Sequence, residues 1–177
     1  MGKTFLFILL FTIFVLGYSF SSDGKFKIFS SDIENGKTIL SKFTCQGENI
    51  SPELEWENVP RKAKSFVLIV DDPDAPFGTF VHWVIYNIPV SVKKLERGIE
   101  RDKMLSNGIT QGVNDFGRIG YDGPCPPPGK PHRYYFKLYA LDENLNLPPS
   151  LRKKDVLKKI EGHILAKAEI MGYYQRK

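Results

Sequence analysis

The sequence predicts a single, mainly β domain with one helix packed on it close to the C-terminus. Residues 66–70 form an unbroken aromatic and β-branched run, and residues 132–141 alternate between polar and apolar side chains. Near the C-terminus, apolar residues recur instead at three- and four-residue steps. The length of 177 residues suits one domain, and a hydrophobic share of 42% is enough for a sizeable core.

The first half of the chain predicts short strands separated by turns. Residues 25–29 alternate polar and apolar side chains, and residues 37–44 predict a second strand. The run at 66–70 fits a strand that is buried on both faces. Residues 79–87 are rich in aromatic and β-branched side chains and stop before Pro89, so they predict the next strand.

The second half predicts a long connection, a strand and a helix. Residues 106–131 are rich in glycine and proline, which excludes regular structure, and so long a connection in a compact domain is usually functional. Residues 132–141 form the clearest strand. The expected helix rests on an apolar stripe and is surrounded by lysines, which indicate a solvated face or contact with an anionic membrane surface. The stripe is Leu157, Ile160, Ile164, Ala168 and Met171, and the lysines are Lys153, Lys154, Lys158, Lys159 and Lys167.

The first 22 residues differ from the rest of the chain. Lys3 is their only side-chain charge, and the run from Phe5 to Leu16 is apolar apart from Thr12. Because a bilayer span needs about 17 to 25 apolar residues, this run is too short to cross a membrane. A positive end, an apolar centre and small residues predict a secretory signal over residues 1–22, cleaved rather than retained as an anchor. We therefore expect an exported domain over residues 23–177, in the periplasm, outside the cell or on the outer face of the membrane.

Two cysteines, Cys45 and Cys125, lie in that domain. An exported protein reaches a compartment that allows disulfides, so a bridge could close a loop of 80 residues (125 − 45). Such a bridge would contribute about 4.5 kcal/mol in the chain-entropy model. Two buried thiols are the alternative, and the sequence leaves both open.

Acidic residues follow the buried run directly, in the segment Asp-Asp-Pro-Asp-Ala-Pro at 71–76. Turn formation alone explains any one of these acids, because aspartate bonds to nearby backbone and proline fixes φ. Three carboxylates within four residues repel one another unless a cationic or hydrogen-bonding group faces them. Asp72 and Asp74 are therefore candidates for a polar site.

Two histidines lie in the strands that follow. Alternation places His82 with Phe80 and Val84 on one face of residues 79–87, although a lone histidine among apolar residues is more often a hydrogen-bonded core residue. His132 and Tyr134 share a face, while Arg133 points the other way, toward solvent or a surface acid. They follow Gly-Pro-Cys-Pro-Pro-Pro-Gly at 123–129, and this rigid wall predicts a pocket rim.

Together these motifs resemble the phosphatidylethanolamine-binding protein family, most closely its bacterial and archaeal Raf-kinase-inhibitor-like branch. The likeness rests on residues 72–76, His82-Trp83, residues 123–128 and 132–134, with support from 44–52 and 111–117, and covers about residues 25–172. It implies a β-sandwich-like fold on a large central sheet with Greek-key connections and a C-terminal α-helix. It also implies a small anion pocket near that helix, formed by Asp72, Asp74, His82, Cys125, Pro126, His132 and Tyr134.

One departure concerns the pocket wall. Position 125 is glycine in the eukaryotic branch and Cys125 here, so a disulfide at this position would narrow or stiffen the mouth of the pocket. The kinase-inhibition role of that branch is not carried over to an exported protein.

The sequence favours a binding protein for a small anionic or phosphorylated ligand, such as a phospholipid headgroup. We expect the imidazoles and the tyrosine hydroxyl to donate to the anion and the aspartates to orient the imidazoles. The alternatives are an inhibitor of a protease or other enzyme, and a hydrolase using histidine and aspartate, but no nucleophile motif appears. The histidine spacing predicts no metal site, no cofactor is expected, and a net charge of +5 without an aromatic–basic stripe argues against nucleic acid. A protein target, and the choice between monomer and homodimer, stay open.

Overall fold

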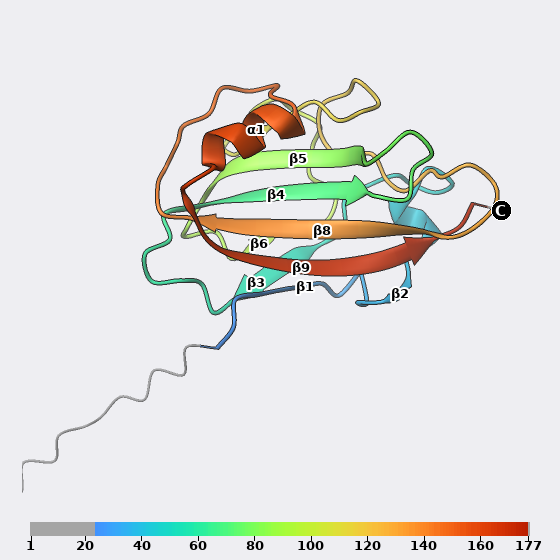
Figure 1. The fold of residues 1–177 in the computed structure, drawn as a ribbon, viewed down its shortest axis with the longest axis horizontal. Helices are drawn as coiled ribbons and strands as arrows, with labels where there is room; N and C mark the ends of the chain where they lie inside the picture. Colours follow the sequence, from blue (N-terminus) through green and yellow to red (C-terminus); the bar gives the residue numbers. More distant parts are fainter. Residues whose placement is uncertain (1–23, 177) are drawn as a thin grey trace, which may run out of the picture.

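The computed structural model describes residues 24–176, which form two β-sheets packed as a sandwich with one helix on the outer face of the larger sheet (Figure 1). The larger sheet has the strand order β2-β9-β8-β4-β5-β7 and the smaller one β1-β3-β6. The strands are β1 (Lys27–Phe29), β2 (Lys37–Thr38), β3 (Leu54–Glu57), β4 (Ser65–Asp72), β5 (Phe80–Pro89), β6 (Lys94–Leu95), β7 (Thr110–Gln111), β8 (His132–Leu141) and β9 (Ile164–Tyr174), and the helix is α1 (Lys153–Ile160).

Strand β4 lies at the centre of the larger sheet and is buried along its whole length. Its neighbours β5 and β8 both run antiparallel to it. Phe66, Leu68 and Val70 enter the core between the two sheets, whereas Val67 and Ile69 pack beneath α1 on the opposite face. The predicted strand buried on both faces is therefore confirmed, and its two coverings explain why its sequence does not alternate.

The strand predicted at 132–141 is confirmed as β8, whereas two other expectations were wrong. Of residues 37–44, only Lys37–Thr38 form a strand, and a 3₁₀ turn follows at Ser41–Phe43. The connection at 106–131 is not wholly irregular, because Thr110–Gln111 pair with β5. Thr110 and Gln111 are fully buried, and sheet pairing satisfies backbone groups that could not reach water.

The helix expected from the C-terminal stripe is much shorter than predicted. It ends at Ile160, Gly162 takes a left-handed φ of 85°, and Ile164–Tyr174 form strand β9. Steps of four residues are also multiples of two, so Ile160, Ile164 and Ala168 fit a strand as well as a helix. Pairing with β8 over its full length decides the outcome, and Ala168, Ile170 and Tyr174 point into the core.

The lysines around the predicted stripe do not form one solvated helix face. Lys167 lies on β9, and Lys153 turns inward to Asp71 at the end of β4. The Asp71 carboxylate is fully buried and lies 2.5 Å from Lys153 Nζ and 2.6 Å from Lys137 Nζ. This pairing fixes the start of α1 to the strand end that also carries Asp72.

The predicted signal at residues 1–22 lies outside the described residues. Within residues 24–176, no helix is long and apolar enough to cross a membrane.

Candidate functional site

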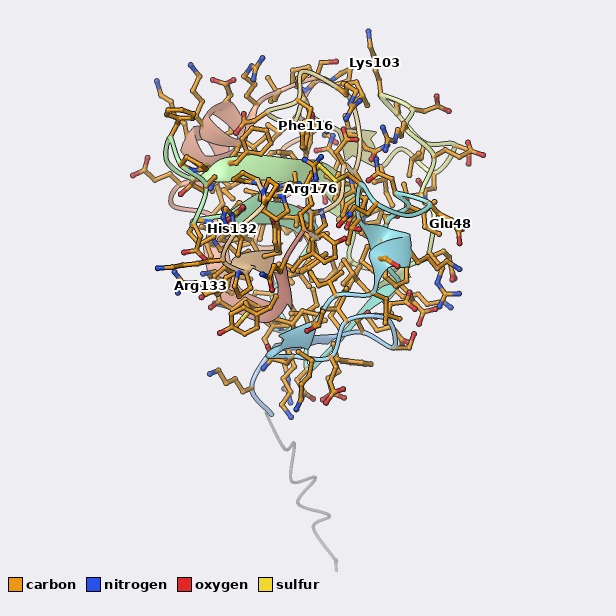
Figure 2. All side chains as sticks on the ribbon, turned by 90° about the vertical axis from the view of Figure 1, so that its right-hand side faces the viewer. Glu48, Lys103, Phe116, His132, Arg133 and Arg176 are labelled. Carbon is orange, nitrogen blue, oxygen red and sulfur yellow. A yellow bond between two sulfur atoms is a disulfide. The ribbon has the colours of Figure 1, made fainter. Side chains whose placement is uncertain are left out.

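A cavity of about 530 Å³ opens at the end of the larger sheet, where β4 ends and β5 begins. Figure 2 views the molecule from this end, with His132 and Phe116 labelled on the side facing the reader. Four segments supply its lining: the turn after β4 with the start of β5, the 115–116 loop, the proline wall and the start of β8. The lining residues are Asp72, Ala75, Pro76, Phe77, Gly78, Thr79, Phe80, His82, Asp115, Phe116, Cys125, Pro126, Pro127 and His132.

Asp72 and His132 form a hydrogen-bonded pair in this cavity. Asp72 Oδ2 lies 2.7 Å from His132 Nδ1, and Asp72 Oδ1 accepts the backbone N–H of Asp74 at 2.8 Å. Because a carboxylate accepts hydrogen bonds, His132 Nδ1 carries a proton, and the ring presents Nε2 as its second polar atom. The carboxylate thus orients the imidazole, as the sequence led us to expect.

His82 reaches the cavity through an irregularity in β5. Val70 pairs with Trp83 and Asp71 with Val81, so His82 is an extra residue, a β-bulge. The predicted alternation was wrong here, since the bulge moves Val84 to the same apolar cluster as Val81, on the helix side of the sheet. A bulge that re-aims a side chain is frequent beside functional sites.

The imidazole of His82 is almost completely buried and has one fixed partner. Its Nδ1 lies 2.7 Å from the backbone oxygen of Asp122. The rings of Phe80, Phe116 and Tyr134 surround it at centroid distances of 5.3, 5.5 and 5.2 Å. Burial lowers the pKa of His82, because the charged imidazolium loses its hydration.

Tyr134 contributes a buried hydroxyl beside His82, although it is not among the residues that line the cavity. Within the described part of the chain its oxygen has no hydrogen-bond partner. Burial, and then the charge of Asp72, raise the pKa of Tyr134, so the group stays a neutral donor. An unpartnered buried hydroxyl costs stability, which is consistent with an acceptor supplied by a ligand.

Asp74, by contrast, does not line the cavity and binds Arg133. The carboxylate accepts two side-chain hydrogen bonds from Arg133, at 2.9 and 2.6 Å, and its backbone N–H at 2.9 Å. The side-chain bonds are the main reason why the pKa of Asp74 falls to about 2. The surface acid expected opposite Arg133 is therefore Asp74, which ties the turn after β4 to the start of β8.

The proline wall is cross-linked from outside. Cys45 and Cys125 form a disulfide with a Cα–Cα distance of 5.4 Å, so the expectation that they lie close enough to bridge is confirmed. The backbone N–H of Cys45 also donates to Pro124 at 3.1 Å. Cys125 and Pro126 both line the cavity, and the bridge therefore fixes this wall to the loop around residue 45.

Sequence reasoning did not single out Asp122, which organises the loop on the other side of the cavity. Its buried carboxylate accepts from Asn114 at 2.8 Å and from Arg118 at 2.9 and 2.7 Å, and pairs with Arg101 at 3.1 Å. Its backbone oxygen meanwhile holds His82. No local pattern identifies this group, because its partners come from four separate places in the chain.

The aromatic residues of the cavity were also missed as site residues. Phe77 is fully exposed on the turn after β4, and Phe116 is partly exposed beside Asp115. Phe116 and Asp115 lie inside the segment 111–117 that supported the family resemblance, which is the one signal that could have identified them. Together with Phe80 and the prolines, they make much of the lining apolar.

The polar residues do not form a metal cluster in residues 24–176, where no group of three or more His, Cys, Asp and Glu side chains is placed to hold a metal ion.

Comparisons with known proteins agree with this fold. The family model for phosphatidylethanolamine-binding protein matches residues 29–175. An Aquifex aeolicus protein named UPF0098 is 52% identical over 89% of this chain and 93% of its own length. A Pyrococcus horikoshii protein of the same name is 46% identical over 99% of this chain and 91% of its own length.

Two crystal structures extend the likeness to the fold. A Chlamydia trachomatis protein, described as a homologue of the phosphatidylethanolamine-binding protein, superimposes with a TM-score of 0.79 at 41% identity, covering 86% of this chain and 99% of its own. Escherichia coli YbcL, described as a new member of the mammalian family, superimposes with a TM-score of 0.82 at 37% identity, and the match covers 87% of this chain and 100% of YbcL. The chain belongs to the phosphatidylethanolamine-binding protein family, as do these bacterial and archaeal relatives.

Proposed function

We propose that this protein binds a small anionic or phosphorylated ligand, with the anion held in the cavity between the proline wall and the turn after β4. The observation that carries the proposal is the convergence of His132 and His82 in that cavity, with the unpartnered hydroxyl of Tyr134 beside them. A phosphate group offers the acceptor that this hydroxyl lacks.

The donors for such an anion come from imidazole and hydroxyl groups. His132 supports this role best, because Asp72 accepts a hydrogen bond from its Nδ1, and a protonated ring then offers its Nε2–H to the ligand. Affinity should therefore fall as the pH rises past the range in which imidazoles lose their proton.

Binding is better supported than hydrolysis. Cys125, the thiol nearest to the cavity, is oxidised in the disulfide and offers no nucleophile. Thr79 is the only other hydroxyl or thiol side chain among the described lining residues, and it is exposed, with no hydrogen bond to either cavity histidine. An activated nucleophile needs a base within hydrogen-bonding reach.

We also propose that the domain is exported. The disulfide supports this proposal, because such bridges persist in oxidising compartments, and the apolar run near the N-terminus is what an export signal requires. Intact mass of the protein from its own host tests it. A mature chain beginning near residue 23 supports export with cleavage, and one beginning at Met1 or Gly2 contradicts cleavage and favours a retained N-terminal anchor instead.

Calorimetric titration with inorganic phosphate and with phosphoethanolamine tests the binding proposal. His132→Ala should weaken both ligands at least about tenfold, since a charge-assisted hydrogen bond is lost. The matched control is His163→Ala, because His163 lies outside the cavity, paired with Asp142. Equal affinities in wild type and His132→Ala, unchanged from about pH 5 to 8, would mean that the cavity histidines are structural.

A further inference from the structure

The hydrogen bond to Asp122 fixes which nitrogen of His82 carries the proton. A backbone carbonyl oxygen can only accept, so Nδ1, at 2.7 Å, must be the donor. In the neutral ring, Nε2 then has a lone pair and no hydrogen. Burial lowers the pKa of His82, which keeps the ring in this neutral form at neutral pH.

The cavity contains other groups that accept hydrogen bonds. Asp72 and Asp115 line it with carboxylates, and no lysine or arginine belongs to its described lining. Three arginines pair with acids around the cavity: Arg118 with Asp122, Arg133 with Asp74, and Arg152 with the lining residue Asp115 at 3.7 Å. An anion without any proton would meet at least three side-chain acceptors, against the side-chain donors at His132, Tyr134 and Thr79.

We propose that this cavity selects oxyanions that carry a proton, and that His82 Nε2 accepts the O–H of the bound ligand. The preferred class is then phosphate and phosphate monoesters in their monoanionic form, and fully ionised anions of the same shape are rejected. The inference rests on the proposed function and names His82 as the residue that sets its specificity.

Sulfate separates this inference from simple charge attraction. It has the tetrahedral shape and approximate size of phosphate, but it carries no proton near neutral pH. A bound sulfate oxygen would place its lone pair against that of Nε2, on a ring that is almost completely buried. Leaving one buried acceptor unsatisfied corresponds to a loss of affinity on the order of 30-fold.

The experiment compares protonated and unprotonated anions on the wild-type protein. Phosphate, arsenate, sulfate and molybdate are titrated calorimetrically at about pH 7 and constant ionic strength. Phosphate and arsenate, which retain a proton, should bind at least about 30-fold more tightly than sulfate and molybdate. Equal binding of all four anions would overturn the inference while leaving anion binding intact, whereas no binding of any would overturn the proposed function itself.

His82→Gln tests the assigned residue. The glutamine amide can turn its NH₂ toward the ligand, so the ratio of phosphate to sulfate affinity should fall to within about threefold, mainly because sulfate binds better. His163→Gln, outside the cavity, should keep the wild-type ratio. An unchanged ratio in folded His82→Gln would overturn the assignment, and if that variant does not fold, the four-anion comparison on wild type still decides.

Discussion

The Cys45–Cys125 bridge makes a contribution to stability that follows from chain length. It closes a loop of 80 residues, and the loop-closure entropy removed from the unfolded chain corresponds to about 4.5 kcal/mol. Replacing both cysteines by alanine should therefore lower the free energy of unfolding by about 4 kcal/mol, and the melting temperature by about 8 to 16 °C for a domain of this size. The wall of the cavity should be loosened as well, because Cys125 belongs to its lining.

Urea denaturation followed by tryptophan fluorescence measures this loss. The slope with urea should rise, since an unfolded chain without the cross-link exposes more surface. Wild-type protein unfolded in reducing buffer is the control, because it keeps both cysteine side chains and should reproduce the variant. A loss below about 1 kcal/mol with an unchanged slope would refute the reasoning. It would mean that contacts such as the hydrogen bond from Cys45 N–H to the Pro124 oxygen either persist in the unfolded chain, or hold residues 45 and 125 together in the folded protein without the disulfide.

Three further predictions concern single side chains. Asp71→Ala leaves the half-buried Lys137 and Lys153 without their acidic partner, so the free energy of unfolding measured by urea titration should fall by about 3 kcal/mol. An equal loss for Asp102→Ala, at an exposed position, would contradict this. Tyr134→Phe should raise the free energy of unfolding by about 1 kcal/mol, because it removes a buried hydroxyl that has no protein partner, but it should weaken phosphate binding. A destabilisation above about 1 kcal/mol would reveal an acceptor in the folded protein, such as Asp72. Arg133→Met should lower the free energy of unfolding by a constant amount above about pH 4, and by less as the pH falls toward about 2, because Asp74, whose pKa is depressed, attracts Arg133 only while its carboxyl is ionised. An equally large difference between variant and wild type in urea titrations at acid pH would refute this.

Local sequence determined the long strands β4, β5 and β8. The buried run before Asp71 can only be a central strand, and the alternation from His132 to Leu141 matches β8 at both ends. The C-terminal segment could not be decided in this way, because Ile160, Ile164 and Ala168 satisfy the periods of helix and strand equally. Pairing with β8, a contact remote from any local signal, makes residues 164–174 a strand.

The candidate site divides in the same way. The order of the motifs was enough to bring Asp72, His82, Cys125, Pro126 and His132 together, because each lies at a strand end or in the wall that family resemblance identifies. The roles of these groups depended on partners that sequence spacing does not encode.

Only the tertiary structure decided those partners. It assigned Asp74 to Arg133 and placed His82 on a bulge whose register depends on β4. It also set the Asp122 carbonyl against Nδ1, which gives the ring its tautomer. Hydrogen-bond directions and burial arise from residues brought together by folding, whereas a sequence records only neighbours along the chain, so residue types can be predicted where donor and acceptor roles cannot.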